Sequence, residues 1–328
     1  MPAAFVAVFF VWPVANVLGR GAAIGDVVGD AHLRAVAWFT LWQAVVSTLL
    51  TVVVALPCAW TLARFRFRGR SVVWALVTVP FVLPTVVVAS AFVAVLRPHH
   101  LVPGVGAVLA AHVYFNVAVV ARTVGNALAH VDPHLEESAR VLGASRWRAF
   151  REVSLPLVRP ALVAAASIVF LFTFTSFGVV LLLGGPSRAT IDVEIWRQVA
   201  YFLDLRTASA LAVVQLVAVV AALSVSSRLA RGSVPRVPRE ASRPLRGWRD
   251  RMLVAGVLGA TLAFLVTPLV VVAYRSVDTA SGIGLGYYRA LGTVRRGSSL
   301  FVAPERAIWN SVLFAVVATM LALVVGGI

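Results

Sequence analysis

Long apolar stretches constrain the fold of this chain more than any other feature. A helix that crosses the hydrocarbon core of a bilayer needs about 20 mostly apolar residues. Of the 328 residues 60% are hydrophobic and only 13% are charged, whereas about a quarter of a soluble domain is charged. The fold class is therefore all-α, a polytopic membrane helical bundle with about eight spans. The predicted spans are Ala3–Leu18, Ala37–Leu62, Val72–Leu96, Val105–Ala121, Leu157–Leu183, Ala208–Leu229, Met252–Tyr274 and Ile308–Ile328.

Arginines mark one side of the predicted membrane. The chain contains no lysine, so all 29 of its basic residues are arginine. Eighteen of them lie in or at the edges of three alternate loops, which follow the second, fourth and sixth spans. Because loops rich in arginine stay in the cytoplasm, these loops and the N-terminus are predicted to be cytoplasmic. The net charge of +16 is thus assigned to membrane topology, and nucleic-acid binding is not expected.

An internal repeat divides the chain. The sequence of Ala44–Leu50 in the second span aligns with that of Ala315–Leu321 in the eighth. Residues 1–230 are predicted to form a six-span unit, 231–251 a cytoplasmic linker rich in Arg and Pro, and 252–328 the first two spans of a second, incomplete unit. Because the second unit stops inside a helix, we expect the chain to be truncated at its C-terminal end.

A polar segment at 130–156, between the fourth and fifth spans, carries the most specific pattern. Asp132 is suited to cap a helix, and Pro133 is favoured at the first helical position. Glu136 and Glu137 follow in or near the first turn, where the helix dipole favours acids. The segment therefore predicts a helix that begins at Asp132.

The same segment contains the signals for a bend and a second helix. Gly143 can adopt the left-handed conformation that ends a helix. Ser145 can cap a second helix, and Pro156 is expected just after its end. One face of the first helix is apolar and is formed by Leu135, Ala139 and Leu142. A compact amphipathic helix pair of this kind can dock into a groove of a partner.

The spacing in this segment resembles the EAA motif of ABC-importer permeases. Glu137-Ser138-Ala139 is followed after three residues by Gly143, and after nine more by Val153-Ser154-Leu155-Pro156. Ser138 and Val153 are small departures from the Ala and Ile of the family pattern. In that family the motif forms the helix that couples the permease to its ATPase. The resemblance implies six coupling residues: Glu137, Ser138, Ala139, Gly143, Leu155 and Pro156.

The wider sequence is similar to the thiamine and ferric-iron permeases, in which two six-span halves are fused. The similarity rests on His112–Asn116, Ser176–Gly178, Gly184–Pro186 and an external amphipathic helix at Ile191–Phe202. It implies a multi-pass subunit of the bacterial inner membrane that imports ferric iron or thiamine. An extracytoplasmic substrate-binding protein would deliver the substrate. An ATP-independent carrier or channel, and a non-functional permease fragment, are the alternatives.

The missing lysine separates this chain from the ATPase. A Walker A loop requires lysine to hold nucleotide phosphates, so ATP hydrolysis is expected from a separate subunit. The chain is therefore predicted to be a transport subunit without enzymatic activity. No cofactor and no resident metal are expected. A transient iron contact at His99 and His100 is a weaker hypothesis than a solvated loop, and the Asp132-Pro133 break separates His130 from His134.

Polar residues within the spans are candidates for the translocation path. Asn116, Thr173, Thr175 and Ser176 are the candidates, of which the last three are expected near the middle of the fifth span. Gln43 and Gln215 are further polar residues in spans. Hydrogen bonding between helices is the favoured alternative for each of them.

Overall fold

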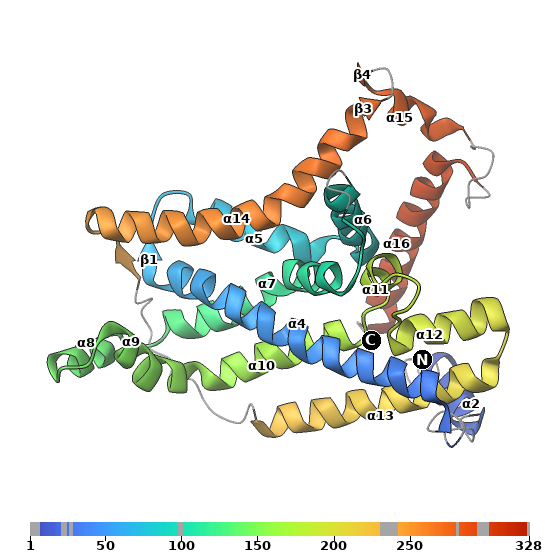
Figure 1. Ribbon diagram of the computed structural model, residues 1–328, viewed down its shortest axis with the longest axis horizontal. Coiled ribbons are helices and arrows are strands. Elements are labelled where there is room, and N and C mark those ends of the chain that lie inside the picture. The colour runs from blue at the N-terminus through green and yellow to red at the C-terminus, as the bar shows by residue number, and fades with distance from the viewer. Residues whose placement is uncertain are drawn as a thin grey trace. The chain divides into compact units, whose positions relative to one another are not determined.

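The computed structural model describes residues 7–20, 25, 29–97, 101–229, 242–279, 282–293 and 302–326. These residues divide into two compact units. Figure 1 shows the elements of both units. One comprises Gly21–Leu269, and the other comprises Met1–Arg20 with Val270–Ile328. The helix α14 (Gly247–Val277) contains the boundary between them.

The larger unit is almost entirely helical. Its two short strands pair in parallel, with Phe65 opposite Arg243. Its elements are α4 (Ala31–Arg64), β1 (Phe65–Arg66), α5 (Arg70–Val82), α6 (Thr85–Leu96), α7 (Val105–Ala129), α8 (Pro133–Val141), α9 (Arg146–Ala149), η4 (Phe150–Ser154), α10 (Leu155–Phe174), α11 (Gly178–Leu183), α12 (Ile191–Arg197), η5 (Gln198–Phe202), α13 (Leu205–Leu229), β2 (Arg243–Pro244) and the first part of α14.

The described part of the smaller unit contains four helical regions and a short hairpin. Its elements are η1 (Ala7–Val11), α2 (Trp12–Arg20), the last part of α14, β3 (Asp278–Thr279), β4 (Gly282–Ile283), α15 (Gly286–Arg289), η6 (Ala290–Gly292) and α16 (Pro304–Gly326). The strands β3 and β4 pair antiparallel. No residue of α16 is buried within the described part of the chain.

The described residues contain six helices that are long and apolar enough to cross a membrane, which confirms an all-α polytopic bundle. A seventh span is possible if α5 and α6 are counted together, although they bend by 101°. Among its described residues, the predicted first span contains a shorter apolar helix, at Ala7–Val17. The predicted count of eight spans is therefore not confirmed.

Two predicted spans are interrupted. The third breaks at Leu83 and Pro84, because a proline disfavours helical conformation in the residue before it; Leu83 is extended, with φ −71° and ψ 144°. The predicted fifth span, Leu157–Leu183, is wrong as a single helix. It separates into α10 and α11 at Thr175–Phe177.

Three long helices, α4, α7 and α10, form the centre of the larger unit (Figure 1). Small side chains on these helices are buried, which allows their backbones to approach closely. Ala44, Ala59, Ala111, Ala121 and Ala165 are all completely inaccessible. The polar residues that this core encloses are therefore positioned by close helix packing.

Gly178 permits a second close approach, between α11 and α6. A Cβ atom at this position would lie 2.7 Å from Oγ1 of Thr85 and 3.1 Å from Cγ2 of Val86. Real Cβ atoms do not tolerate the shorter distance, so a larger residue would displace α11. This packing fixes where the chain turns after the break at Thr175–Phe177.

Candidate functional site

The polar segment between α7 and α10 forms the predicted helix and bend. Asp132 Oδ1 accepts a hydrogen bond from the backbone N–H of His134 at 2.9 Å and so caps α8. Gly143 has φ +94°, a left-handed conformation that favours glycine. Ser145 Oγ accepts from the backbone N–H of Arg148 at 3.2 Å and caps the next helix. Both predicted caps and the predicted bend are confirmed.

The sequence predicts that the second helix ends just before Pro156, and the structure shows that it does not. A continuous helix runs from Trp147 to Phe174. It passes through the π-helical turn η4, in which the N–H of Leu155 donates to the carbonyl of Phe150. Pro156, which is exposed, lies in the first turn of α10. Proline has no backbone N–H to donate to a carbonyl of the preceding turn. The wider π-helical turn η4 changes which carbonyls need a donor, so the helix continues through Pro156.

The outer surface of this helix pair is apolar and exposed. Leu135 is half exposed, and Leu142 is 88% exposed. Ala139 is partly buried, whereas Ser138 is exposed. A patch of this kind on a membrane protein's polar loop is typical of a protein contact surface.

Glu137 lies on the exposed side of α8. Its side chain is 63% exposed, and its Oε2 lies 3.3 Å from Nδ1 of the exposed His134. Surface pairs of this type contribute little to stability. Glu137 is thus available to a partner.

Glu136, the adjacent acid, faces the helix bundle instead. Its Oε1 lies 2.5 Å from Nη2 of Arg64 and accepts a hydrogen bond from Ser154 Oγ. The same arginine nitrogen lies 3.3 Å from Ser154 Oγ. These three residues, the Arg64 cluster, join the C-terminal end of α4 to α8 and to the start of α10. Figure 1 shows α8 and α9 at this end of the bundle.

The Arg64 cluster was not predicted from the sequence. From the sequence, Arg64 is one of the arginines that mark the cytoplasmic side, and Glu136 is an acid in the first helical turn, where it interacts with the helix dipole. The side chain of Arg64 is only 8% exposed, and that of Glu136 is 22% exposed. A charge at the end of an apolar span, with an acid in another cytoplasmic loop, could have suggested the pair, because buried charges require partners.

The predicted path residues lie at the C-terminal end of α10 and on α7, not near the middle of a single fifth span. Thr173 and Ser176 are buried, whereas Thr175 is exposed. Thr173 Oγ1 donates to the carbonyl of Val169 at 2.9 Å, and Thr175 Oγ1 to that of Leu171 at 2.8 Å. Hydrogen bonds within their own helix therefore satisfy both threonines.

Buried polar contacts connect these residues to α4 and α7. His112 on α7 bridges Ser47 Oγ, 3.0 Å from its Nδ1, and Ser176 Oγ, 2.8 Å from its Nε2. Asn116 Nδ2 donates to the carbonyl of His112 at 2.9 Å. Gln43 Nε2 donates to the carbonyl of Thr173 at 2.7 Å. Residue type and spacing alone do not single out His112 as a bridge.

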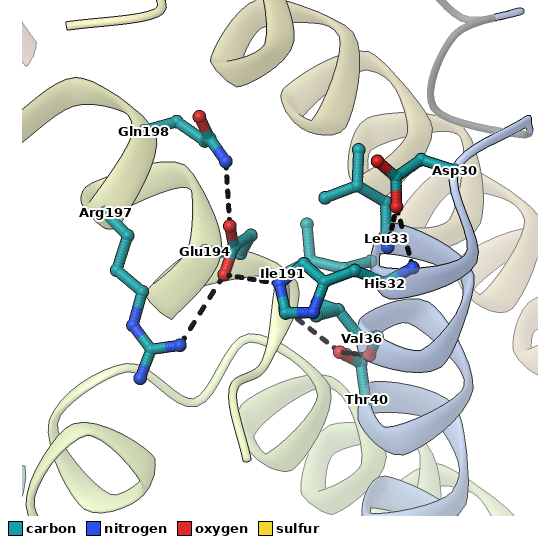
Figure 2. Close-up of polar contacts among 9 residues, drawn as sticks. All are labelled: Asp30, His32, Leu33, Val36, Thr40, Ile191, Glu194, Arg197 and Gln198. Atoms are coloured by element: carbon teal, nitrogen blue, oxygen red, sulfur yellow. Dashed lines mark hydrogen bonds and ion pairs between the residues drawn. The ribbon is translucent and has the colours of Figure 1, made fainter. Parts of the chain in front are cut away.

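A second polar cluster surrounds the buried carboxylate of Glu194 near the start of α4 (Figure 2). Glu194 on α12 is 2% exposed; its Oε2 lies 3.5 Å from His32 Nε2, and its Oε1 accepts from Gln198 Nε2 at 2.8 Å. Oε2 also lies 3.7 Å from Nη1 of Arg197. The N–H of Ile191 donates to Thr40 Oγ1 at 3.0 Å. These contacts attach α12 to the opposite end of α4 from Arg64.

Within the described ranges, no group of three or more His, Cys, Asp or Glu side chains is placed to hold a metal ion. His130 Nδ1 lies 2.7 Å from the carbonyl of Asn126. His99 and His100 lie outside the described residues.

Comparison with known sequences finds transport permeases among the relatives of this chain. Over 322 residues the chain is 29% identical to the thiamine transport system permease protein ThiP of Salmonella typhimurium, covering 90% of this chain and 56% of the relative. It is 31% identical over 175 residues to the sulfate transport system permease protein CysT of Escherichia coli, covering 49% of this chain and 62% of the relative. The chain thus spans about half the length of the ThiP relatives.

A solved structure supports the fold. A bacterial alginate ABC transporter, determined with a periplasmic protein that binds an alginate pentasaccharide, contains a chain with a TM-score of 0.58 and 17% identity. The match covers 71% of this chain and 92% of the other. The family described as the inner membrane component of binding-protein-dependent transport systems matches residues 52–239. The chain belongs to this family of transport permeases.

Proposed function

We propose that this chain is a transmembrane permease subunit of an ABC importer and carries the loop that couples transport to a separate ATPase. The observation that supports this most is the exposed outer surface of α8, whose inward side is bonded to the bundle through Glu136 and Arg64. A loop that is free on one side and held on the other can pass a displacement from a partner to the spans.

The coupling residues have different roles in this proposal. Glu137 and Ser138 contact the ATPase subunit from the exposed side of α8. Ala139 packs beneath them, and Gly143 makes the bend that completes the docking surface. Leu155 and Pro156 lead from the loop into α10.

The Arg64 cluster supplies the inward connection. A movement of α8 displaces Glu136, which is bonded to the last residue of α4 and to Ser154 at the start of α10. Helix α4 contributes Ser47 to the buried polar contacts around His112 on α7, and α10 ends two residues before Ser176, the other partner of His112. Asn116, Thr173, Thr175 and Ser176 remain the proposed path residues, because they lie at or beside these contacts.

Thiamine is the proposed cargo. The similarity to thiamine permeases extends over 90% of this chain, whereas that to the sulfate permease covers 49%. These relatives give no support to ferric iron. An extracytoplasmic binding protein delivers the cargo, and the subunit lies in the bacterial inner membrane with its N-terminus in the cytoplasm, as the arginine distribution indicates.

Replacement of Glu137 tests the coupling role. Glu137→Arg should reduce co-purification of the ATPase subunit and abolish uptake in the assembled transporter. Glu152→Arg is the matched control, because Glu152 is also acidic and about half exposed in the same loop. If Glu137→Arg leaves both assembly and uptake intact, the coupling assignment is wrong.

The cargo is tested separately, with the soluble binding protein of the same transport system. Calorimetric titration with thiamine, sulfate and ferric iron should show binding of thiamine alone. Binding of sulfate or iron instead would refute the cargo and leave the permease role standing.

A further inference from the structure

Two adjoining cavities run along α5 and α7 in the larger unit. The first has a volume of about 480 Å³ and the second about 560 Å³. Trp74 lines both of them. The first lies where α4 ends, α5 begins and α7 ends, and the second lies further along α5.

The first cavity is basic and polar. Arg66, Arg70 and His130 line it, together with Ser71 and Asn126, and no acidic residue is part of the lining. The first residues of α5, a helix of 13 residues, line the same space. The first backbone N–H groups of this helix add partial positive charge to that of the arginines. The cavity thus offers an anionic group both charge and hydrogen-bond donors.

The second cavity is mainly apolar. Its lining includes Val79, Val82 and Leu83, with Thr78 and Arg122 as polar members. Arg122 Nη1 lies 3.4 Å from Thr78 Oγ1. Arg122 is exposed although it lies about two turns, or roughly 10 Å, before the end of α7. At that depth a long basic side chain reaches toward the headgroup region.

We propose that these two cavities bind one anionic phospholipid. Its phosphate lies among Arg66, Arg70 and His130, and an acyl chain follows α5 past Trp74 into the apolar cavity. The helix rises about 18 Å between Arg70 and Val82. A lipid that lies along α5 can therefore place its headgroup at one end of the helix and its acyl chain toward the other. A free phosphate would explain the basic cavity but not the apolar one, and basic pockets between spans suit anionic headgroups.

Lipid retention by the purified chain tests this site. The chain is reconstituted in nanodiscs of phosphatidylglycerol and phosphatidylcholine, and bound lipids are counted by native mass spectrometry after extraction. Arg66→Gln should lower the preference for phosphatidylglycerol about fivefold, and Arg66→Gln/Arg70→Gln should lower it further. Arg68→Gln is the matched control, because Arg68 is exposed in the same loop but does not line the cavity.

If the double variant Arg66→Gln/Arg70→Gln fails to fold, the single variant Arg66→Gln still tests the site. Arg70 Nε donates to the carbonyl of Leu62 at 3.0 Å, so its loss can disturb the loop, whereas Arg66 is exposed. An equal loss in Arg68→Gln would show diffuse attraction to positive charge and overturn the proposal. No loss in Arg66→Gln would also overturn it.

A second pair of variants tests the apolar cavity. Val79→Trp should fill it and reduce lipid retention without changing charge. Leu76→Trp is its control, since Leu76 is exposed on the same helix and outside both linings. Displacement of the lipid by inorganic phosphate alone, or equal retention in the two tryptophan variants, would refute a site for the acyl chain.

Discussion

The Arg64 cluster yields the sharpest prediction. Glu136→Gln keeps the size of the side chain and removes its charge, so Arg64 loses its acidic partner. The variant retains an amide that can bond Ser154 Oγ. Any large effect is therefore due to the ion pair and not to lost packing.

The magnitude follows from burial. Loss of one partner from a fully buried ion pair costs about 3–5 kcal/mol, whereas an exposed pair contributes about 0–1 kcal/mol. The two side chains are 8% and 22% exposed, which is intermediate but closer to buried. We expect a cost of about 2 kcal/mol, equivalent to roughly a 30-fold increase in the population of the opened loop.

Limited trypsin digestion measures this opening. Arg140, Arg148 and Arg151 are exposed cleavage sites in or beside the loop. Cleavage there requires local unfolding and tracks the population of the open form when reclosing is fast. Cleavage in Glu136→Gln should therefore be roughly 30-fold faster than in the parent chain.

The adjacent glutamate provides the control. Glu137→Gln makes the same change of charge one residue away, on the exposed side of α8, and should change the cleavage rate less than twofold. The double variant Arg64→Gln/Glu136→Gln should be cleaved no faster than the faster single variant, because both remove the same interaction. Equal acceleration by Glu137→Gln, or multiplication of the two single effects, would refute the reasoning.

Three further outcomes follow from the geometry. Gly143→Ala forces a Cβ into a left-handed conformation and should destabilise the bend by about 1–2 kcal/mol, seen as faster digestion of the loop; unchanged digestion would contradict this. Gly178→Ala should lower the midpoint of thermal unfolding, because the added Cβ overlaps Thr85 at a cost of about 1–3 kcal/mol. Gly106→Ala is the control and should not lower it, because the space around Gly106 is open. Equal midpoints for the two variants would show that α11 can move. Glu194→Gln should also lower the midpoint, because Arg197 then loses its anionic partner, and a midpoint at or above the parent value would exclude a stabilising role.

The sequence predicted those features that depend on local chemistry. Apolar length placed the main helices, and the cap at Asp132 and the bend at Gly143 follow from residue type alone. Apolar length alone does not predict the break at Leu83, although Pro84 signals it. The separation of α10 from α11 was missed because both flanks of Thr175–Phe177 are equally apolar.

Contacts between distant residues could not be predicted in this way. The sequence places Glu136 and Glu137 side by side, and nothing in residue type says which of them faces Arg64. Helix phase decides it, since neighbouring positions on a helix point about 100° apart. His112 is similar, because its bridge requires three segments whose packing is determined only by the assembled bundle.

Helix α4 connects the two polar clusters of the larger unit. The Arg64 cluster lies at its C-terminal end, and the contacts of His32 and Thr40 with α12 lie near its start. Between His32 and Arg64 the helix rises about 48 Å, and it contributes Gln43 and Ser47 to the buried polar contacts on the way. Pro57 lies inside α4 and removes one backbone hydrogen bond, so the helix can bend at that point and is not a uniformly rigid rod. Helix α4 thus links the loop contact at Glu136 to the contacts of α12 as one continuous helix that can bend between them.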